Sequence, residues 1–422
     1  MERALLVNVE FKHEKEKPGP EDSAQELEEL VLACAVEAVD NITVFCEKPT
    51  PNLLIGRGKA EELAMLVQEE NADTVIFSRD LSGTQQRNLE DVIGKKTIDR
   101  TQLILDIFSR RAKSPEGKMQ VELAQLQYLM PRLVGKGIML SRLGGGVGTR
   151  GPGEQKLELD RRTIRKRIDR LEADLKGLML RRTVMRKKRK DNSIPLIALV
   201  GYTSAGKSTL LNTLTNSEQV VSNSLFTTLD PLSKNFQLPN GENVVISDTV
   251  GFLRELPHHL IEAFKATLEE VVQADLLVHV LDASSPKVYE HSQAVFEVLE
   301  ELGVKDKPAI TALNKIDLMD DKMWVEKLKE DFPGSVEISA KLRINIEGLF
   351  ERMEESFSCR MVNTEVLVPS GRMDIIDLFY RQGKVEKIEY RQKGIKVKVN
   401  LPRILFAKLL SNHEIEEIGL RG

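Results

Sequence analysis

The sequence predicts a multidomain protein of the α/β class, and three observations support this fold class. Short β-like runs alternate with helical stretches over residues 1–108, which is the pattern of an α/β layer. Two later stretches carry apolar residues at spacings of three, four and seven, and an apolar strand at 194–200 leads through a short loop into a helix. The 422 residues are too many for one compact core, and 41% hydrophobic residues are enough to fill two to four domains.

The first predicted domain covers residues 1–110 and is a small α/β domain. Its β-like runs include "ALLVNVEF" and "ADTVIFS", and its helical stretches include "SAQELEELVLACAVEAV" and "GKAEELAMLVQEE". Within it, "LIGRGKAEEL" resembles a phosphate-binding loop, but Ala60 stands where a Ser or Thr must follow the lysine to ligate magnesium. We therefore interpret this stretch as a turn from a strand into a helix.

Residues 111–192 are predicted to form an antiparallel helical hairpin. Two sets of apolar residues follow heptad spacing, namely Met119, Leu123, Leu126, Met130 and Leu133, then Leu157, Ile164, Ile168, Leu171, Leu175 and Leu178. Arms of roughly 25 residues would reach about 37 Å. Between them, "GGGVGTRGPG" at 144–153 places six glycines at the tip of the hairpin.

The glycine-rich tip and the basic segment 156–190, which we call the stalk, suggest contact with a polyanion. The segment 156–190 carries 15 Lys and Arg against 5 Asp and Glu, a local charge of +10 in a chain of net charge −4. A glycine-rich tip bearing Lys136, Arg142 and Arg150 would fit a crevice in folded RNA, because glycine permits close approach. A solvated helix face for the charges and a flexible linker for the glycines remain open. A dinucleotide-binding loop is disfavoured because a helix, and not a strand, precedes it.

The strongest motif is "GYTSAGKST", which follows the strand "IPLIALV" and precedes the helical run "LLNTLTN". This is the context of a Walker A loop (P-loop), in which backbone N–H groups and a helix N-terminus surround phosphates. Lys207 would reach the β- and γ-phosphate oxygens, and Ser208 would ligate Mg²⁺.

Two further motifs predict that the bound base is guanine. "NKID" at 314–317 follows a predicted buried strand, and Asp317 can accept from both N1 and the 2-amino group of guanine, a donor pair that adenine lacks. "SAK" begins at Ser339, 25 residues after Asn314, and supplies a backbone N–H near guanine O6.

Between these motifs lie the residues expected to respond to the γ-phosphate. In "VVISDTVGF", Asp248 lies 40 residues after Ser208 and suits a carboxylate that faces magnesium, while Gly251 suits a γ-phosphate sensor. Upstream, "SLFTTLDP" offers two threonines for switch I, and we select Thr228 as the Mg²⁺ ligand with Thr227 as the alternative. Five motifs in this order and spacing predict guanine-nucleotide binding.

These motifs give three sets of candidate residues. The catalytic residues are Lys207, Thr228 and Gly251, and the metal ligands are Ser208 and Thr228. The residues expected to contact the nucleotide are Gly201, Tyr202, Thr203, Ser204, Ala205, Gly206, Lys207, Ser208, Phe226, Thr227, Thr228, Leu229, Asp230, Asp248, Thr249, Val250, Gly251, Asn314, Lys315, Ile316, Asp317, Ser339, Ala340 and Lys341. Mg²⁺ is the expected cofactor, with GTP as the substrate.

The motifs together resemble those of HflX-type GTPases, ribosome-associated enzymes of the TRAFAC class. The resemblance rests on "GYTSAGKS", "FTTLDP", "DTVGFLRELPHHL", "NKID" and "SAK", with "LIGRGKAEEL" and "GGGVGTRGPGEQKLELDRR" upstream, and it covers nearly the whole chain. It implies a Ras-like G domain, which we place at 193–358, and a small α+β C-terminal domain at 359–422. It also implies GTP hydrolysis to GDP and phosphate, and binding to the large ribosomal subunit with the glycine-rich tip against ribosomal RNA. A role in ribosome dissociation, rescue or biogenesis follows from the same resemblance.

Three residues bear on mechanism within this resemblance. Phe252 follows Gly251, where Ras-like proteins commonly carry a glutamine that positions water, so slow intrinsic hydrolysis is expected. Ser204 stands where the family's P-loop usually has an Asn linked to potassium activation, so potassium dependence is left open. Arg254 either contacts phosphate or RNA or forms a surface ion pair. The family's association with adenine nucleotides finds no competent phosphate loop in the N-terminal region.

The C-terminal segment contains two alternating runs, "KVEKIEY" and "IKVKVNL", around "RQKG". They predict a β-hairpin with Lys and Arg on one face. Docking of a partner and capping of the G domain are both open for this domain.

Composition argues against membrane, secreted, disulfide-rich and zinc-binding classes of protein. No apolar run approaches the roughly 18 residues of a membrane helix, and the N-terminus lacks a signal peptide, so we expect a cytoplasmic protein, and a monomer. Cys34, Cys46 and Cys359 are scattered, which argues against a disulfide framework or a zinc cluster. Three function classes stay open: a ribosome-acting GTPase, a GTP-dependent signalling switch with a protein effector, and an RNA-binding scaffold with a silent G domain.

Overall fold

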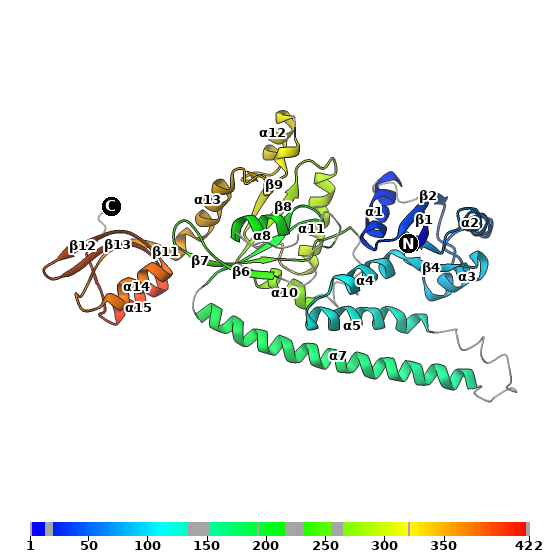
Figure 1. Ribbon diagram of the computed structural model, residues 1–422, viewed down its shortest axis with the longest axis horizontal. Coiled ribbons are helices and arrows are strands. Elements are labelled where there is room, and N and C mark those ends of the chain that lie inside the picture. Colours follow the sequence, from blue (N-terminus) through cyan, green and yellow to red (C-terminus); the bar gives the residue numbers. More distant parts are fainter. Residues whose placement is uncertain are drawn as a thin grey trace. The chain divides into compact units, whose positions relative to one another are not determined.

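The structure is a computed structural model that describes residues 2–12, 20–133, 152–191, 194–215, 226, 232–254, 265–319 and 321–418. The chain forms two compact units (Figure 1). The first contains residues 1–180, 222–230 and 256–265, and the second contains residues 181–221, 231–255 and 266–422. The predicted multidomain α/β fold is confirmed, and the residues that the structure describes form three separate sheets.

The first unit contains a four-stranded parallel sheet in the order β2-β1-β3-β4. Its strands are β1 (Arg3–Phe11), β2 (Glu37–Cys46), β3 (Thr74–Phe77) and β4 (Lys96–Asp99), and its helices are α1 (Pro20–Ala33), α2 (Arg57–Glu69), α3 (Gly83–Ile93), α4 (Arg100–Arg111) and α5 (Pro115–Arg132). Strand β1 carries an apolar run at residues 4–7 because both of its faces are covered there, and Leu5, Leu6 and Val7 have no exposed surface.

The stretch that resembles a phosphate-binding loop is the start of α2. The helix begins after Gly56, and the residues before it form a tight turn closed by an isolated bridge between Thr50 and Leu54. The predicted turn from a strand into a helix is therefore confirmed, since this stretch lies in the connection from β2 to α2. The ammonium group of Lys59 is paired with Glu62, one turn further along the helix.

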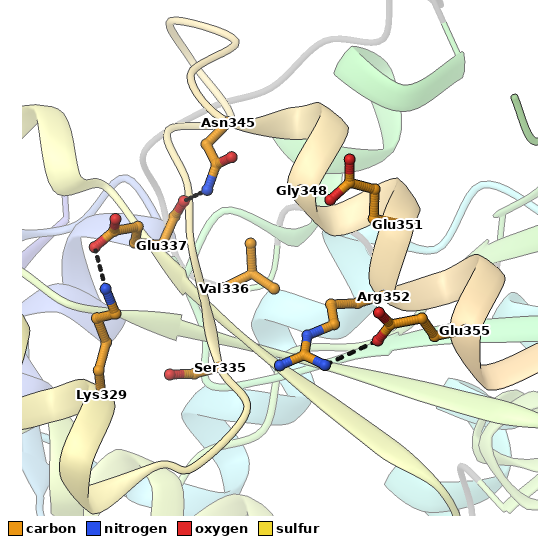
Figure 2. A pocket seen from close by; sticks show the side chains of 9 residues that line it. All are labelled: Lys329, Ser335, Val336, Glu337, Asn345, Gly348, Glu351, Arg352 and Glu355. Atoms are coloured by element: carbon orange, nitrogen blue, oxygen red, sulfur yellow. Dashed lines mark hydrogen bonds and ion pairs between the residues drawn. The ribbon is translucent and has the colours of Figure 1, made fainter.

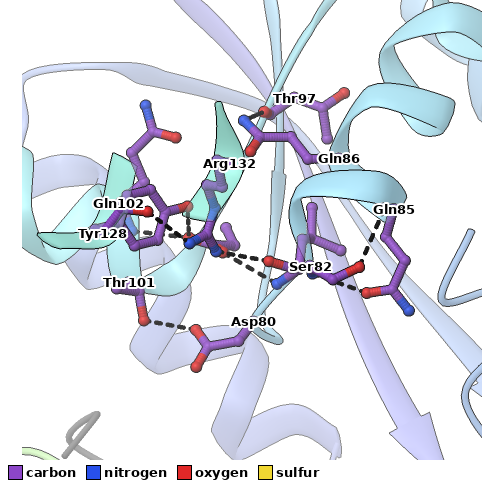
Figure 3. A network of polar contacts seen from close by, with 11 residues as sticks. Asp80, Ser82, Gln85, Gln86, Thr97, Thr101, Gln102, Tyr128 and Arg132 are labelled. Atoms are coloured by element: carbon purple, nitrogen blue, oxygen red, sulfur yellow. Dashed lines mark hydrogen bonds and ion pairs between the residues drawn. The ribbon is translucent and has the colours of Figure 1, made fainter. Parts of the chain in front are cut away.

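A buried polar network holds the C-terminal end of α5 on the α/β sheet (Figure 3). The carboxylate of Asp99 is fully buried and accepts from the backbone N–H groups of Leu81 (3.0 Å) and Gln102 (2.8 Å) and from the hydroxyl of Tyr128 (2.8 Å). Arg132 donates to Asp99 at 3.0 Å, and its guanidinium lies 3.4 Å from the centroid of the Tyr128 ring. The chain therefore leaves α5 from a fixed point.

Helices α5 and α7 (Pro152–Asp191) form the antiparallel pair that the heptad spacing predicts (Figure 1). Leu123 packs with Ile168, Leu171 and Leu175 across the pair. The expectation of two arms of roughly 25 residues was wrong, since α5 has 18 residues and α7 has 40. Helix α5 is bounded by a Ser–Pro start and a proline near its end, whereas α7 has no proline after its first residue. Most of the glycine-rich tip lies outside the described residues.

The second unit contains a six-stranded sheet in the order β10-β9-β8-β5-β7-β6. Its strands are β5 (Leu196–Val200), β6 (Leu232–Gln237), β7 (Asn243–Asp248), β8 (Leu276–Asp282), β9 (Ala309–Asn314) and β10 (Val336–Glu337). All neighbours are parallel except β6, which pairs with β7 in antiparallel register. The loops that follow β5, β7 and β9 therefore meet at the carboxyl edge of the sheet.

Helices and 3₁₀ turns surround this sheet and complete the G domain. They are α8 (Lys207–Thr215), α10 (Lys265–Gln273), α11 (Val288–Glu301), η1 (Ile316–Leu318), α12 (Lys322–Asp331), α13 (Ile346–Phe357) and η2 (Ser358–Arg360). The core between them contains Ile197, Val278 and Leu349, all without exposed surface. Among the described residues, no helix combines the length and apolar character that a membrane crossing needs.

The C-terminal domain is a four-stranded antiparallel sheet in the order β12-β13-β11-β14 with two helices. Its elements are β11 (Met361–Val368), α14 (Met373–Gln382), β12 (Lys384–Arg391), β13 (Gly394–Pro402), α15 (Arg403–Ser411) and β14 (Glu416–Glu417). The predicted hairpin is β12-β13. Its lysines are matched by acids, since Lys396 pairs with Glu365 and Lys398 pairs with Glu386, each at 2.7 Å. The expected Lys and Arg face is thus largely neutralised.

Candidate functional site

The P-loop joins β5 to α8 at the carboxyl edge of the G-domain sheet. Gly206 has a φ of +97°, and a Cβ at this position would lie 2.3 Å from Nδ2 of Asn314. A Cβ at Gly201 would lie 2.3 Å from the carbonyl oxygen of Val280. The two P-loop glycines are therefore required by close packing of the loop against β8 and β9.

Lys207 is the buried cation of this loop, with 6% of its surface exposed. Its Nζ donates to the carbonyl oxygens of Gly201 (3.0 Å) and Tyr202 (2.8 Å). Burial lowers the pKa of Lys207 to about 8, although the nearby carboxylate of Asp248 opposes this shift. A phosphate beside the ammonium would favour its charged form, which suits the phosphate-binding role predicted from the sequence.

Ser208 and Asp248 are brought together from the P-loop and the end of β7. The Ser208 hydroxyl donates to Oδ2 of Asp248 at 2.6 Å, and Asp248 has no exposed surface. A hydroxyl and a carboxylate at this spacing are hard oxygen donors of the kind that Mg²⁺ prefers. The residues present therefore fit the expected cofactor.

The segment after β7 is paired with the P-loop through backbone hydrogen bonds. Thr203 N–H donates to the carbonyl of Phe252 (2.9 Å), and Phe252 N–H donates to the carbonyl of Gly201 (3.1 Å). Phe252 is 2% exposed, and a Cβ at Gly251 would lie 2.8 Å from Cγ2 of Thr203. The candidate γ-phosphate sensor thus rests directly on the P-loop, with no room for a side chain. Beside it, Val250 is buried, and the Thr249 hydroxyl donates to the carbonyl of Leu199 at 2.6 Å.

Tyr202 links this pairing to α11. Its ring stacks on His291 with centroids 4.0 Å apart and an interplanar angle of 10°, and its hydroxyl accepts from Arg254 N–H at 3.4 Å. Burial, together with Arg254, lowers the pKa of His291 to about 4, so the stacked imidazole is neutral at pH 7. The sequence motifs did not predict His291, because no local pattern connects it to a loop 89 positions earlier.

The switch I candidates are only partly described. Phe226 is 2% exposed, has a φ of +55°, and packs edge-on against Phe108 of α4 with ring centroids 4.6 Å apart. Its ring therefore makes a packing contact in the first unit. Thr227, Thr228, Leu229 and Asp230 lie outside the described residues, so their predicted roles remain predictions.

The candidate base-binding edge is built from the loops after β9 and β10. Nδ2 of Asn314 donates to the carbonyl of Ala205 (2.8 Å), and its Oδ1 accepts from Ala340 N–H (2.9 Å). Lys315 has a φ of +65°, and its Nζ donates to Asp282 at 2.6 Å. The N–H predicted to face guanine O6 is thus already bonded within the protein if Ala340 supplies it.

The remaining candidates of this edge are placed around it. Ile316 and Asp317 form the 3₁₀ turn η1, and the Asp317 carboxylate is partly exposed. Ser339 is buried and its hydroxyl accepts from Leu342 N–H at 3.1 Å, while Lys341 is exposed. Trp324 lies beside the edge, where its indole N–H donates to the carbonyl of Ala283 at 3.1 Å.

A separate hollow of about 330 Å³ is lined by residues of α12, β10 and α13 (Figure 2). Two ion pairs lie within it: Lys329 lies 3.7 Å from Glu337, and Arg352 lies 2.8 Å from Glu355. The Asn345 amide donates to the carbonyl of Glu337 at 2.8 Å. These pairings give no reason to assign a ligand to the hollow.

A P-loop against the central strand of a mostly parallel sheet, with Asn314 and Ala340 joined at the same edge, defines the class of P-loop GTPases. Three family models match successive parts of the chain: "GTP-binding GTPase N-terminal" at 21–109, "GTP-binding GTPase Middle Region" at 111–189, and "50S ribosome-binding GTPase" at 196–315.

Curated relatives then give the family. The chain is 46% identical to "GTPase HflX" of Caldanaerobacter subterraneus subsp. tengcongensis, covering 95% of this chain and 91% of the relative. It is 40% identical to "GTPase HflX" of Escherichia coli (strain K12), covering 97% and 95%. Identity at this level over nearly the full length shows that the chain belongs to the HflX family of GTPases, as the sequence motifs indicate.

Two solved structures are similar to this chain over most of its length. A GTP-binding protein from Sulfolobus solfataricus in complex with GDP is 26% identical, covers 85% of this chain and 99% of its own, and gives a TM-score of 0.44. An SsGBP and GDP complex is 27% identical, covers 84% and 98%, and gives a TM-score of 0.46.

Proposed function

We propose that this GTPase binds the large ribosomal subunit and hydrolyses GTP there, in ribosome dissociation, rescue or biogenesis. The observation that carries the proposal is the exposed basic surface of α7, on a hairpin whose other arm is anchored by Asp99 and Arg132. The description "50S ribosome-binding GTPase" of the matching model supports the same partner. In this proposal residues 1–110 form the N-terminal domain, residues 111–192 contact the ribosome and residues 193–358 bind GTP. The protein acts in the cytoplasm as a monomer.

Not every cation of the stalk is available to a polyanion. Arg167 donates to both carboxylate oxygens of Glu122, at 2.7 and 2.8 Å, and is therefore engaged within the hairpin. Arg165, Lys166 and Arg170 are exposed on the same helix. These three side chains are the proposed phosphate contacts, because surface cations bind polyanions by releasing counterions.

The proposed catalytic roles follow from the geometry of the P-loop. Lys207 would exchange its bonds to two loop carbonyls for bonds to the β- and γ-phosphates, and Gly251 N–H would contact the γ-phosphate. Ser208 and Thr228 would hold Mg²⁺ with Asp248 beside them, and the ion would neutralise charge that develops on the phosphate oxygens.

Slow hydrolysis without a partner follows from Phe252. The ring is buried, and it has no group that could orient water. Large ribosomal subunits should therefore raise GTP turnover at least about tenfold, or roughly 1.4 kcal/mol of barrier. A turnover assay with and without subunits measures this, and no stimulation would remove the ribosome as an activating partner.

Sedimentation with large ribosomal subunits tests binding directly, in GDP and in a non-hydrolysable GTP analogue. We expect the chain to pellet with subunits, and more strongly with the analogue. Absence from the pellet in both states would overturn the proposal and favour a signalling switch with a protein effector. Equal binding in both states, with no GTP turnover, would favour the RNA-binding scaffold.

A salt series separates the stalk from the tip. The triple variant of Arg165, Lys166 and Arg170 to Ala should weaken subunit binding and flatten its salt dependence. A matched control changes the exposed Lys95, Lys393 and Lys408 to Ala, which alters net charge equally and should leave both unchanged. Gly144→Val with Gly146→Val, in the tip, should lower affinity without changing the salt slope. Wild-type affinity in both α7 and tip variants would contradict an RNA-contacting hairpin.

A further inference from the structure

The C-terminal domain lies beyond the family models, which end at residue 315. It contacts the G domain at the turn between β6 and β7, residues 238–242, which we call the interswitch turn. This turn lies in sequence between the switch I candidates and Gly251. It is closed by its own hydrogen bonds, from Gly241 N–H to the Leu238 carbonyl (2.8 Å) and from Leu238 N–H to the Glu242 carbonyl (2.9 Å).

Three side chains bond the interswitch turn and its strand to neighbouring elements. Nδ2 of Asn400 in β13 donates to the carbonyl of Asn240 at 3.1 Å. Nδ2 of Asn243 in β7 donates to the carbonyl of Arg381 in α14 at 3.0 Å. Asn240 N–H donates to Glu354 of α13 at 2.7 Å. The turn is therefore bonded to the C-terminal sheet, to its helix, and to the last helix of the G domain.

At the centre of this contact, backbone meets backbone. Gly241 has a φ of +92°, and a Cβ there would lie 2.5 Å from the backbone nitrogen of Lys384 and 2.6 Å from the carbonyl carbon of Gly383. No residue with a side chain fits without moving one domain from the other. Beside it, Glu242 is 3% exposed and its carboxylate lies 3.9 Å from the guanidinium of Arg360, just before β11. This contact is closely packed and desolvated.

The strands behind the turn connect it to the nucleotide site. Strands β6 and β7 pair without a register shift from Gln237 opposite Asn243 to Leu232 opposite Asp248. Asp248 bonds to Ser208, and β6 starts directly after the segment that holds Thr227 and Thr228. A two-stranded ladder therefore runs from the C-terminal domain to the predicted phosphate side of the site, where a γ-phosphate would make its contacts.

We propose that the C-terminal domain is coupled to the bound nucleotide through the interswitch turn. Replacing GDP by GTP then changes the local stability of the C-terminal domain. By linkage, if GTP in place of GDP changes the affinity of this domain for a ligand by some factor, that ligand changes the relative affinity for the two nucleotides by the same factor. This assigns the domain a regulatory role toward the G domain that does not depend on which partner activates hydrolysis.

Hydrogen exchange of the full chain tests the coupling, in GDP and in a non-hydrolysable GTP analogue. In the wild type we expect exchange in β11, β13 and α14 to differ at least about threefold between the two states. Gly241→Ala should abolish that difference, because the added Cβ meets the backbone of the C-terminal domain. Gly303→Ala is the matched control, since Gly303 also has a positive φ (+69°) but no atom near its missing Cβ.

A second variant keeps the test valid if Gly241→Ala misfolds. Asn243→Ala with Asn400→Ala removes two hydrogen bonds without introducing a clash, and it should reduce the nucleotide-dependent difference at least about twofold. The same variant should change the ratio of GDP to GTP-analogue dissociation rates by at least about threefold. Exchange in the wild-type C-terminal domain that is equal in both nucleotides would overturn the proposal. So would an undiminished difference in both decoupling variants.

Discussion

The two halves of the nucleotide site differ in how much of their hydrogen bonding is already in place. On the base side, Asn314 joins the P-loop to Ala340, and Asp282 holds Lys315. On the proposed phosphate side, Lys207 is bonded to loop carbonyls and Ser208 to Asp248, and we expect these bonds to be exchanged when a nucleotide binds. We therefore expect the base side to be preorganised, and the phosphate side to rearrange on binding and to report the nucleotide state.

The largest effect is expected at the phosphate side. Lys207→Met should reduce GTP turnover at least about 1000-fold, because the proposed role of this buried ammonium is to donate to the charge that develops on the phosphate oxygens. The nucleotide-free variant should be at least as stable as the wild type, since it no longer buries a charge. Turnover and melting with and without Mg²⁺·GTP measure both. A wild-type melting shift by Mg²⁺·GTP would contradict the assignment.

The base side should respond with a change of specificity. Asp317→Asn should weaken GTP binding about 100-fold, because two charge-assisted hydrogen bonds to guanine are lost. The same variant should prefer XTP, whose carbonyl can accept from the new amide. Competition with labelled nucleotides measures the preference, and XTP binding serves as the folding control. A variant that still prefers GTP would show that the base is recognised elsewhere.

Tyr202 sharpens the comparison, because it holds the segment after β7 against the P-loop. Tyr202→Ala should lower kcat about tenfold with KM changed less than about twofold, since the stack on His291 steadies the loop whose backbone pairs with Phe252. Tyr202→Phe keeps the stack and should retain most of kcat. Equal losses in the two variants would transfer the role from the ring to the hydroxyl.

Acid should destabilise the fold through the buried His279. His279 of β8 pairs in register with Val200, directly before the P-loop, and burial lowers its pKa to about 4. Between pH 6.5 and about 4, the unfolded chain binds a proton that the folded chain excludes, so stability falls as pH drops through this window. His279→Leu should reduce the slope by up to about 1.4 kcal/mol per pH unit, and denaturant titrations across pH measure it. The exposed His413→Asn is the control, and an unchanged slope in His279→Leu would contradict the prediction.

The smallest effect is expected at Ser204. Its φ is +59°, a conformation that Asn adopts more readily than Ser. Ser204→Asn should therefore stabilise the nucleotide-free protein by about 0.5 kcal/mol. It should also introduce a response of GTP turnover to potassium, because the family resemblance links an Asn at this position to potassium activation. Melting curves, and turnover in sodium against potassium, measure the two effects. A destabilised variant would show that the serine hydroxyl has its own role in the loop.

Local motifs predicted the loops of this candidate site better than the contacts between distant residues that hold those loops in place. "GYTSAGKST", "NKID" and "SAK" are contiguous, and their strand-loop-helix context fixes the loops that carry them. The stack of Tyr202 on His291 and the bond from Lys315 to Asp282 join residues far apart in sequence, so no local pattern reveals them. The bond from Ala340 to Asn314 depends on packing between two loops, which motif spacing does not encode.

The same contrast holds for the fold. Heptad spacing predicted the pairing of Leu123 with Ile168 and Leu171, because the period of an apolar stripe is written in the sequence. It did not predict the lengths of α5 and α7, since a charged helix continues for as long as nothing interrupts it. The network around Asp99 went unnoticed because an isolated Asp, Tyr and Arg have no spacing that distinguishes a buried cluster from surface residues.

One feature of the base side gives the molecule a built-in optical reporter. The chain has a single tryptophan, Trp324, whose indole is bonded to Ala283, next to the Asp282 that holds Lys315. Its fluorescence therefore originates entirely from the neighbourhood of the base. We expect emission to change when a guanine nucleotide binds and to differ little between GDP and GTP. The signal would therefore measure nucleotide occupancy and would not report hydrolysis.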